Sequence, residues 1–208
     1  MANNIITARI TIEGVRPLLQ HAFGPEALSQ EKHEKSGSAG NDPTEWRRTC
    51  MITPNGQLYV TSMYIFSLLR EAGKHTKRGR ATLQGAVSST LQVITDPVLI
   101  DRFFPGYPAN GTVFDAGKVD PPPTNQSAPV FLSVMGCRNP ATRGRNVRYR
   151  IGCSAGWKAN FLISWDKTVV AREQMNAIAI DAGTLVGLAD GRALGFGRFT
   201  VTEFTIIE

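Results

Sequence analysis

The residues best suited to chemistry lie near the C-terminus, in the stretch GTLVGLADGRALGFGRFTVTEF over 183–204. Guanidinium groups and exposed backbone N–H groups together suit phosphate oxygens, and Arg192 and Arg198 supply the guanidinium groups here. Glycines remove side-chain bulk and let a backbone approach a ligand closely. The glycines expected to take part are Gly187, Gly195 and Gly197. The stretch therefore predicts a loop that packs against the backbone of a polyanion.

Two other interpretations of the glycines compete with this one. A Walker loop needs a lysine after its glycines, and a dinucleotide-binding loop follows a strand and opens a helix. Here no lysine follows, and the stretch leaves a predicted helix and enters a predicted strand, which argues against both. The glycines can also be structural, with Gly183 or Gly187 ending the helix in a left-handed conformation. That interpretation explains GFGRF only if another backbone comes close to it.

Two clusters of basic residues support a polyanionic partner independently of the glycines. The chain carries a formal net charge of +6 and has a pI near 9.5. The first cluster lies at and beyond the end of a predicted helix and contains Arg70, Lys74, His75, Lys77, Arg78 and Arg80. The second surrounds RNPATRGRNVRYR and contains Arg138, Arg143, Arg145, Arg148 and Arg150. Cations also stabilise a helix C-terminus, and a charged hairpin can simply be solvated, so these alternatives stay open.

Aromatic side chains can add stacking platforms to a surface that binds single strands. Tyr149, Trp157 and Phe196 are the candidates. Arg47 and Arg48 follow Trp46 directly and are expected on the same surface. The sequence contains no RNP-type aromatic motif.

The spacing of apolar residues predicts the elements that would position these side chains. Strands are predicted over 4–13, 129–137, 146–154, 157–166 and 199–207, and helices over 61–74 and 169–187. This order predicts an α+β fold, with a ferredoxin-like, RRM-like βαββαβ core in which helices cover one face of an antiparallel sheet. The middle hairpin is expected to join the strands that flank Ala155 and Gly156.

The remaining segments are polar or rich in turn residues. The whole chain, 1–208, is expected to be a single domain. Residues 25–46 are rich in Gly, Ser and charged residues and predict a mobile loop. Residues 81–129 contain several turn signals and are interpreted as an insertion that decorates the core.

Two segments, GLADGRALGFGRF and ITARITIEGVRPLLQHAF, resemble the RAMP superfamily of repeat-associated RNA-binding proteins, which includes backbone subunits of CRISPR effector complexes. The closing GL-x-D-x-R-x-x-GFGRF pattern also looks like uncharacterised phage and prophage proteins. The resemblance covers both ends of the chain and the helix near residue 65. It implies an RRM-like fold, RNA or single-stranded DNA as partner, and assembly along the strand as a homo-oligomer or filament, with other effector subunits as further partners.

An enzymatic alternative rests on His21. The resemblance implies this place for the general base of some RAMP-type endoribonucleases, and metal-independent RNA cleavage also needs a cation near the phosphate. Lys74 or Lys77 could supply that cation. A histidine after a turn is more often structural, and the sequence has no nucleophile elbow or metal-ligating carboxylate pair. A non-catalytic role without metal or cofactor is therefore expected.

Composition narrows the class of protein further. No apolar run of about eighteen residues predicts a membrane span, and the N-terminal segment does not resemble a secretory signal. The cysteines, Cys50, Cys137 and Cys153, are far apart, which fits the cytoplasm of a bacterial or phage-infected cell. The main hypothesis is a non-catalytic RNA or single-stranded-DNA binding protein. A phage structural or assembly protein is the third alternative.

Overall fold

The chain divides into two compact units in a computed structural model that describes residues 4–23, 39–108, 111–138 and 143–207. The core unit comprises Met1–Leu18, Tyr59–Asp101 and Ala155–Glu208. The inserted unit comprises Leu19–Leu58 and Arg102–Ser154. Where the sequence predicts one domain with an insertion over 81–129, the structure therefore has a core that is interrupted twice. Most of the predicted mobile loop over 25–46 lies outside the described residues.

The core unit has the predicted α+β, ferredoxin-like order. Its elements are β1 (Ile5–Gly14), α2 (Ser62–Ala72), β5 (Lys77–Arg78), β6 (Ala81–Thr82), α3 (Gln84–Thr90), β7 (Gln92–Val93), β8 (Val98–Phe103), β11 (Lys158–Asp166), α4 (Arg172–Asp181) and β12 (Phe199–Ile207). The sheet order is β12-β1-β11-β8-β4, with β4 at Gln57–Val60 and β7 beside β11. The first strand thus lies between the third and fourth strands of the βαββαβ motif.

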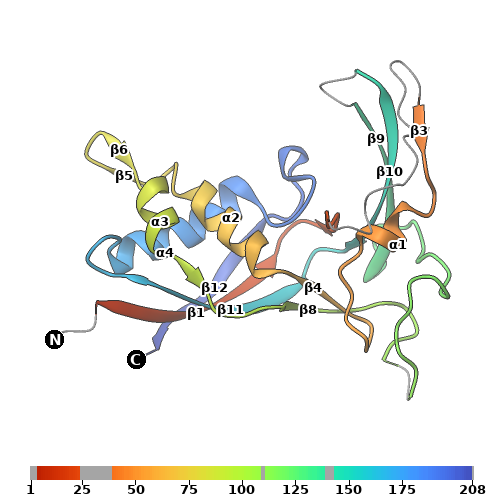
Figure 1. Cartoon of the computed structure of the whole chain (residues 1–208), viewed down its shortest axis with the longest axis horizontal. Coiled ribbons are helices and arrows are strands. Elements are labelled where there is room, and N and C mark those ends of the chain that lie inside the picture. The colour runs from red at the N-terminus through yellow and green to blue at the C-terminus, as the bar shows by residue number, and fades with distance from the viewer. Residues whose placement is uncertain (1–3, 24–38, 109–110, 139–142, 208) are drawn as a thin grey trace. The chain divides into compact units, whose positions relative to one another are not determined.

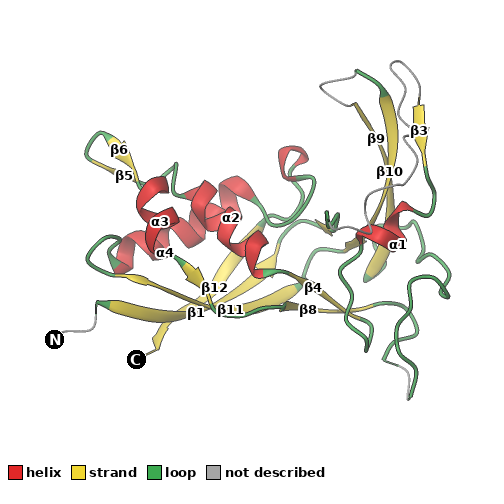
Figure 2. Cartoon of the chain, viewed as in Figure 1, coloured by secondary structure: helices red, strands yellow, loops and turns green. Residues whose placement is uncertain are grey.

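Helices cover one face of this sheet, as Figures 1 and 2 show for α2, α3 and α4. The buried side chains of β1 on that face are Ala8, Ile10 and Ile12, and they lie opposite Ile163, Phe161 and Ala159 of β11. The apolar stripe of α2 supplies Ile65, Leu68, Leu69 and Ala72 to the same core. Burial of each large apolar side chain stabilises the fold by about 2 kcal/mol. The alternating apolar side chains of β1 and the helically spaced apolar side chains of α2 therefore pack in one hydrophobic layer.

The inserted unit is built on a second sheet. Its elements are β2 (Leu18–Leu19), which begins at the unit boundary, β3 (Ala39–Asn41), α1 (Glu45–Thr49), β9 (Val130–Arg138) and β10 (Arg145–Cys153). β9 pairs with β10 along its whole length, while β3 and β2 share the other edge of β10. Trp46, Phe104, Tyr107 and Phe114 form an aromatic cluster with ring centroids 4.9–6.4 Å apart.

Three details of the sequence interpretation are corrected. Residues 81–129 are not an insertion throughout, because α3, β7 and β8 belong to the core and β8 is its second long strand. The described end of the segment 25–46 contains β3 and the start of α1. β10 and β11 do not form a hairpin: β10 pairs with β9, while β11 pairs with β1 over 158–166. Gly156 donates instead to the carbonyl of Gly14 at 2.7 Å, which directs the chain into β11.

The glycine-rich stretch joins α4 to β12 by close backbone contacts. A π-helical turn η2 (Ala182–Val186) and a 3-10 turn η3 (Arg192–Leu194) frame it. A Cβ atom on Gly183 would overlap the Phe199 carbonyl oxygen, and one on Gly197, whose φ is +68°, would overlap the Leu188 carbonyl. A Cβ atom on Gly195 would meet open space. These contacts explain why the fold needs glycine at positions 183 and 197.

Substitution of these glycines should therefore have unequal effects on stability. We expect Gly183→Ala and Gly197→Ala each to lower the free energy of unfolding by about 3 kcal/mol, because the new methyl group displaces a backbone carbonyl. Gly195→Ala, at φ +85° but in open space, should cost about 1 kcal/mol. Denaturant unfolding of the three variants measures this difference. Equal losses at all three positions would contradict the close-approach argument.

Candidate nucleic-acid interface

The backbone of the glycine-rich stretch is largely occupied by its own hydrogen bonds. Leu188 and Gly197 are joined by an N–H to carbonyl bond of 2.9 Å, and the Gly197 N–H donates to Pro17 at 2.7 Å. The N–H groups of Gly187 and Gly195 donate to carbonyls of the same segment. The amides of all three glycines predicted to bind phosphate thus have protein acceptors. Arg192 is the cation of the stretch whose side chain is exposed.

Besides Arg192, the stretch contains Arg198, and Arg16 lies beside it. The Arg198 carbonyl accepts the N–H groups of Val15 at 2.8 Å and Arg16 at 3.2 Å. Arg198 is half-buried, whereas the side chain of Arg16 is exposed. Arg16 is a cation that sequence reasoning missed. Only the pairing of the turn after β1 with the start of β12 brings it beside the stretch.

The glycine-rich stretch carries the charge of Arg192 close to α2. Lys74 hydrogen-bonds Glu71 and lowers the pKa of that carboxyl, and the charges of Arg192 and Arg70 lower it further. Burial raises the pKa of Tyr64, also in α2, and the charge of Arg192 opposes that shift. The structure therefore brings together Arg70 and Lys74 with an arginine more than a hundred residues away in the sequence.

The same cluster continues into a short hairpin formed by β5 and β6. Lys77, Arg78 and Arg80 are exposed, and Gly79 makes the turn at φ +64°. Arg78 donates to the Val169 carbonyl at 3.1 Å, which holds the hairpin against the core. Within the described residues no hydrogen bond or ion pair engages the side chains of Lys77, Arg80 or Arg192. We call the following set the core basic cluster: Arg70, Lys74, Lys77, Arg78, Arg80 and Arg192.

In the inserted unit, Arg47 and Arg48 hold structural contacts. Arg47 donates to the carbonyls of Ala116 and Val119, the latter at 3.0 Å, and lies 4.9 Å from the ring centroid of Trp46. Arg48 pairs with Asp42 at 2.5 Å. Burial raises the pKa of Asp42, but bonds from Thr44 and Arg48 outweigh it and leave the pKa lowered. These two arginines order the segment around α1.

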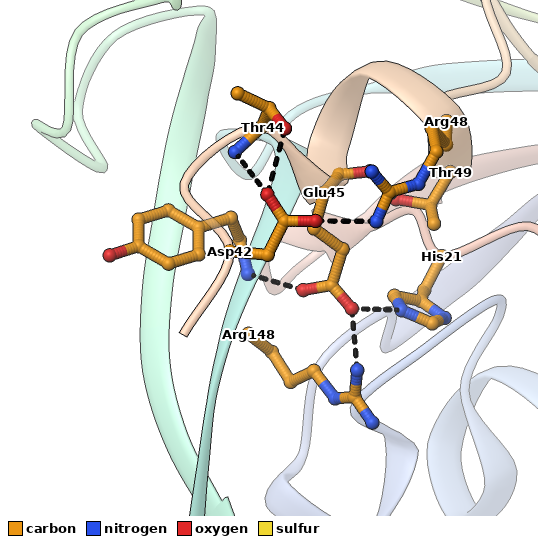
Figure 3. A network of polar contacts seen from close by, with 8 residues as sticks. His21, Asp42, Thr44, Glu45, Arg48, Thr49 and Arg148 are labelled. Carbon is orange, nitrogen blue, oxygen red and sulfur yellow. Dashed lines mark hydrogen bonds and ion pairs between the residues drawn. The ribbon is translucent and has the colours of Figure 1, made fainter. Parts of the chain in front are cut away.

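Glu45, the first residue of α1, is the centre of the polar network in Figure 3. Its Oε1 lies 2.6 Å from Arg148 Nη1 and 3.3 Å from His21 Nε2, and its Oε2 accepts the Tyr149 N–H at 2.9 Å. Burial raises the pKa of this carboxyl, but the contacts with His21, Tyr149 and Arg148 outweigh burial and lower the pKa to about 2. Glu45 therefore stays ionised and ties three segments of the inserted unit together.

The second predicted basic cluster therefore contains both an arginine bound to Glu45 and arginines that are exposed. Arg148 is half-buried and bound to Glu45, and Arg150 is half-buried. Arg143 and Arg145 are exposed, and the Arg143 carbonyl accepts a bond from Arg138 at 3.4 Å. Residues 139–142, the centre of the predicted flexible finger, lie outside the described residues.

The prediction that Trp157 is a stacking platform is wrong. Trp157 is completely buried, packs against Gly14 and donates its ring N–H to the Arg16 carbonyl at 2.9 Å. Phe196 and Tyr149 are half-buried, and the Tyr149 hydroxyl donates to Asn41 at 2.9 Å. The buried indole therefore orders the turn after β1 and is not available for stacking.

The described residues contain no cluster of three or more His, Cys, Asp or Glu side chains that could hold a metal ion. Among the same residues, no helix has both the length and the apolar character that a bilayer span requires.

The Glu45 network should make stability depend on acid pH. Because the pKa of Glu45 falls from 4.5 to about 2 on folding, its contribution is complete above 4.5 and is lost as pH falls towards 2. We expect Glu45→Gln to cost about 2 kcal/mol at neutral pH, since Arg148 loses a charged partner. Urea unfolding across this pH range should show a smaller pH dependence for Glu45→Gln than for wild type. The exposed Glu173→Gln is the control, and parallel pH profiles for wild type and Glu45→Gln would contradict the assignment.

The solved structures that the chain resembles include two at low identity, whereas no protein family and no curated protein matches it. One is a chain of the cryo-EM structure of the Type III-B Cmr-beta bound to cognate target RNA, with 10% identity and a TM-score of 0.48, covering 98% of this chain and 61% of that chain. The other is Cmr6 from Pyrococcus furiosus, with 10% identity and a TM-score of 0.47, covering 98% of this chain and 100% of that chain. Chains this distant need not share a function, which has to be argued from the residues of this chain.

Proposed function

We propose that this protein binds RNA or single-stranded DNA without cleaving it, and that it assembles along the strand as RAMP-type backbone subunits do. The observation that carries the proposal is that Arg192, from the glycine-rich stretch, acts on the same carboxylate, Glu71 of α2, as Arg70 and Lys74 do. Two segments far apart in the sequence thereby contribute to one basic surface of the core unit.

The chemistry of the core basic cluster suits phosphates more than bases. Arginine and lysine groups neutralise phosphate charge and carry no sequence information by themselves. Glu71 is the one carboxylate between Arg70 and Arg80 in the sequence, so the segment keeps a strong positive balance. Because Trp157 is buried, contacts to the phosphate backbone of the nucleic acid would contribute more to binding than base stacking. Weak sequence preference and strong salt dependence follow from this.

The remaining candidates of the sequence interpretation keep supporting roles in the proposal. Arg143 and Arg145 are exposed in the inserted unit and are available to a strand or to a neighbouring subunit. Arg198 lies in the glycine-rich stretch, and Arg16 lies beside it. Other effector subunits are further proposed partners, and the proposed setting is the cytoplasm of a bacterial or phage-infected cell.

Single-charge variants test the core basic cluster. We expect Arg80→Ala and Arg192→Ala to weaken binding to single-stranded RNA or DNA. Each should reduce the slope of log K against log salt by about 0.7, the contribution of one phosphate contact with a single strand. Fluorescence anisotropy with labelled oligonucleotides at several salt concentrations measures both quantities for each nucleic acid.

Lys118→Ala is the matched control, because Lys118 is exposed, belongs to the inserted unit and pairs with Asp115 at 3.1 Å. It removes one positive charge without touching the core basic cluster. If Lys118→Ala changes the salt slope as much as Arg192→Ala does, net charge and not this cluster governs binding. If wild type binds no single strand near physiological salt, the proposed function is wrong.

The endoribonuclease alternative has its own test. His21 Nε2 contacts the ionised Glu45, so a nitrogen that a general base would need is already engaged with a carboxylate. We expect purified wild type and His21→Ala to leave labelled RNA equally intact in the absence of metal. Gel analysis of the RNA after prolonged incubation measures this. Cleavage by wild type that His21→Ala abolishes, with RNA binding retained, would establish the enzyme instead.

A further inference from the structure

The outer edge of β12 is a long strand edge without a partner among the described residues. β12 spans Phe199–Ile207 and pairs with β1 on one side only, at the end of the sheet order. An unpaired edge offers a row of backbone N–H and carbonyl groups to another strand. Natural edges are often protected by lysine or proline, and β12 contains neither.

A β-bulge divides β12 into two halves with opposite alternation. Thr11 pairs with Glu203 and Ile12 with Val201, so Thr202 is the extra residue. Thr200 and Glu203 lie on the open face of the sheet, opposite Glu13 and Thr11, and the Thr11 hydroxyl donates to Glu203. Thr202 is exposed, and we assign it to the same face; the Thr200 and Thr202 hydroxyls donate to the carbonyls of Glu13 and Thr11. Phe199, Val201, Phe204 and Ile206 occupy the helix-covered face, opposite Gly14, Ile12, Ile10 and Ala8.

This broken alternation restricts how β12 can pair with another strand. Directly opposite residues of an antiparallel pair share a face of the sheet. Suppose that two copies of β12 pair antiparallel. Opposite residues then share a face along the whole strand only if the two-fold axis lies between Thr202 and Glu203. The opposite pairs are then Phe199 with Ile206, Thr200 with Thr205, Val201 with Phe204, and Thr202 with Glu203. A slip by one residue in either direction sets an apolar side chain against the open face.

From this self-complementarity we propose that two copies of this chain associate through β12 and continue the core sheet across a two-fold axis. The pairing covers Val201, Phe204 and Ile206, which are half-buried at the edge, with apolar side chains of the second copy. The strand at the other end of the sheet, β4, has four residues and offers a shorter edge. A second β12 therefore fits better than β4 of a neighbour.

Charge explains why such a dimer would be weak. Glu203 is the one charged residue of β12, and it lies opposite Thr202 of the second copy, adjacent to the axis. The two Glu203 carboxylates approach each other along the open face. Like charges at neighbouring positions of a sheet oppose pairing.

Mixed-variant cross-linking tests the register. We expect a short bismaleimide to cross-link a mixture of Thr200→Cys and Thr205→Cys proteins, because these positions lie directly opposite. Either variant alone should stay uncross-linked, since its two cysteines would be roughly 16 Å apart along the strands. Wild type, which retains Cys50, Cys137 and Cys153, controls for native thiols.

Sedimentation equilibrium tests the interface without cysteines. Glu203→Gln removes both carboxylates from the axis and should lower the dimer dissociation constant about two- to fivefold. A protein that remains monomeric at its highest soluble concentration, or single cysteine variants that cross-link as well as the mixture, would overturn the proposal. Because neither measurement contains nucleic acid, their failure leaves the proposed nucleic-acid binding intact.

Discussion

The core unit depends on a backbone-to-backbone approach that only glycine allows. Gly183 lies against the Phe199 carbonyl, and Gly197 lies against Leu188 while its own N–H bonds to Pro17. These contacts clamp the end of α4 to the start of β12 and fix β12 beside β1. The hydrophobic layer between helices and sheet can close only when the last strand is in that position. The placement of Arg192 against α2 follows from the same path of the chain.

A buried carboxylate has the corresponding role in the inserted unit. A buried charge is costly unless polar groups bind it, and the Glu45 carboxylate has three such contacts: His21, Arg148 and the backbone N–H of Tyr149. Those partners come from separate segments, so the ion pair specifies the arrangement of α1 and β10. Arg148 therefore serves a structural role first, although Arg143 and Arg145 earlier in the same segment are exposed. The same reasoning applies to Arg47, whose guanidinium group satisfies two backbone carbonyls.

Periodicity was sufficient to predict the elements whose apolar pattern is strong, because each needs only its own residues. β1, α2, α4 and β12 all lie where alternation or helical spacing places them. β8 was hidden in the segment 81–129, since its assignment depends on a partner strand, β11, that the chain reaches much later. The supposed hairpin of β10 and β11 failed for the same reason: short turns are visible in a sequence, but strand partners are not. Of the site, the basic clusters could be predicted, whereas Arg16 and the acceptors of Arg47 could not.

Basic residues that are adjacent in a sequence need not form one surface. The run from Arg138 to Arg150 contains exposed cations and one that a buried glutamate holds in place, so counting its charges overstates what a ligand could contact. The cluster after α2 behaves in the opposite way, since folding adds Arg192 from a distant segment. The same close packing that leaves the glycine amides bonded within the protein fixes the backbone path that carries Arg192. In the proposed function, this loop would therefore contribute the Arg192 side chain to phosphate binding, and not its own N–H groups.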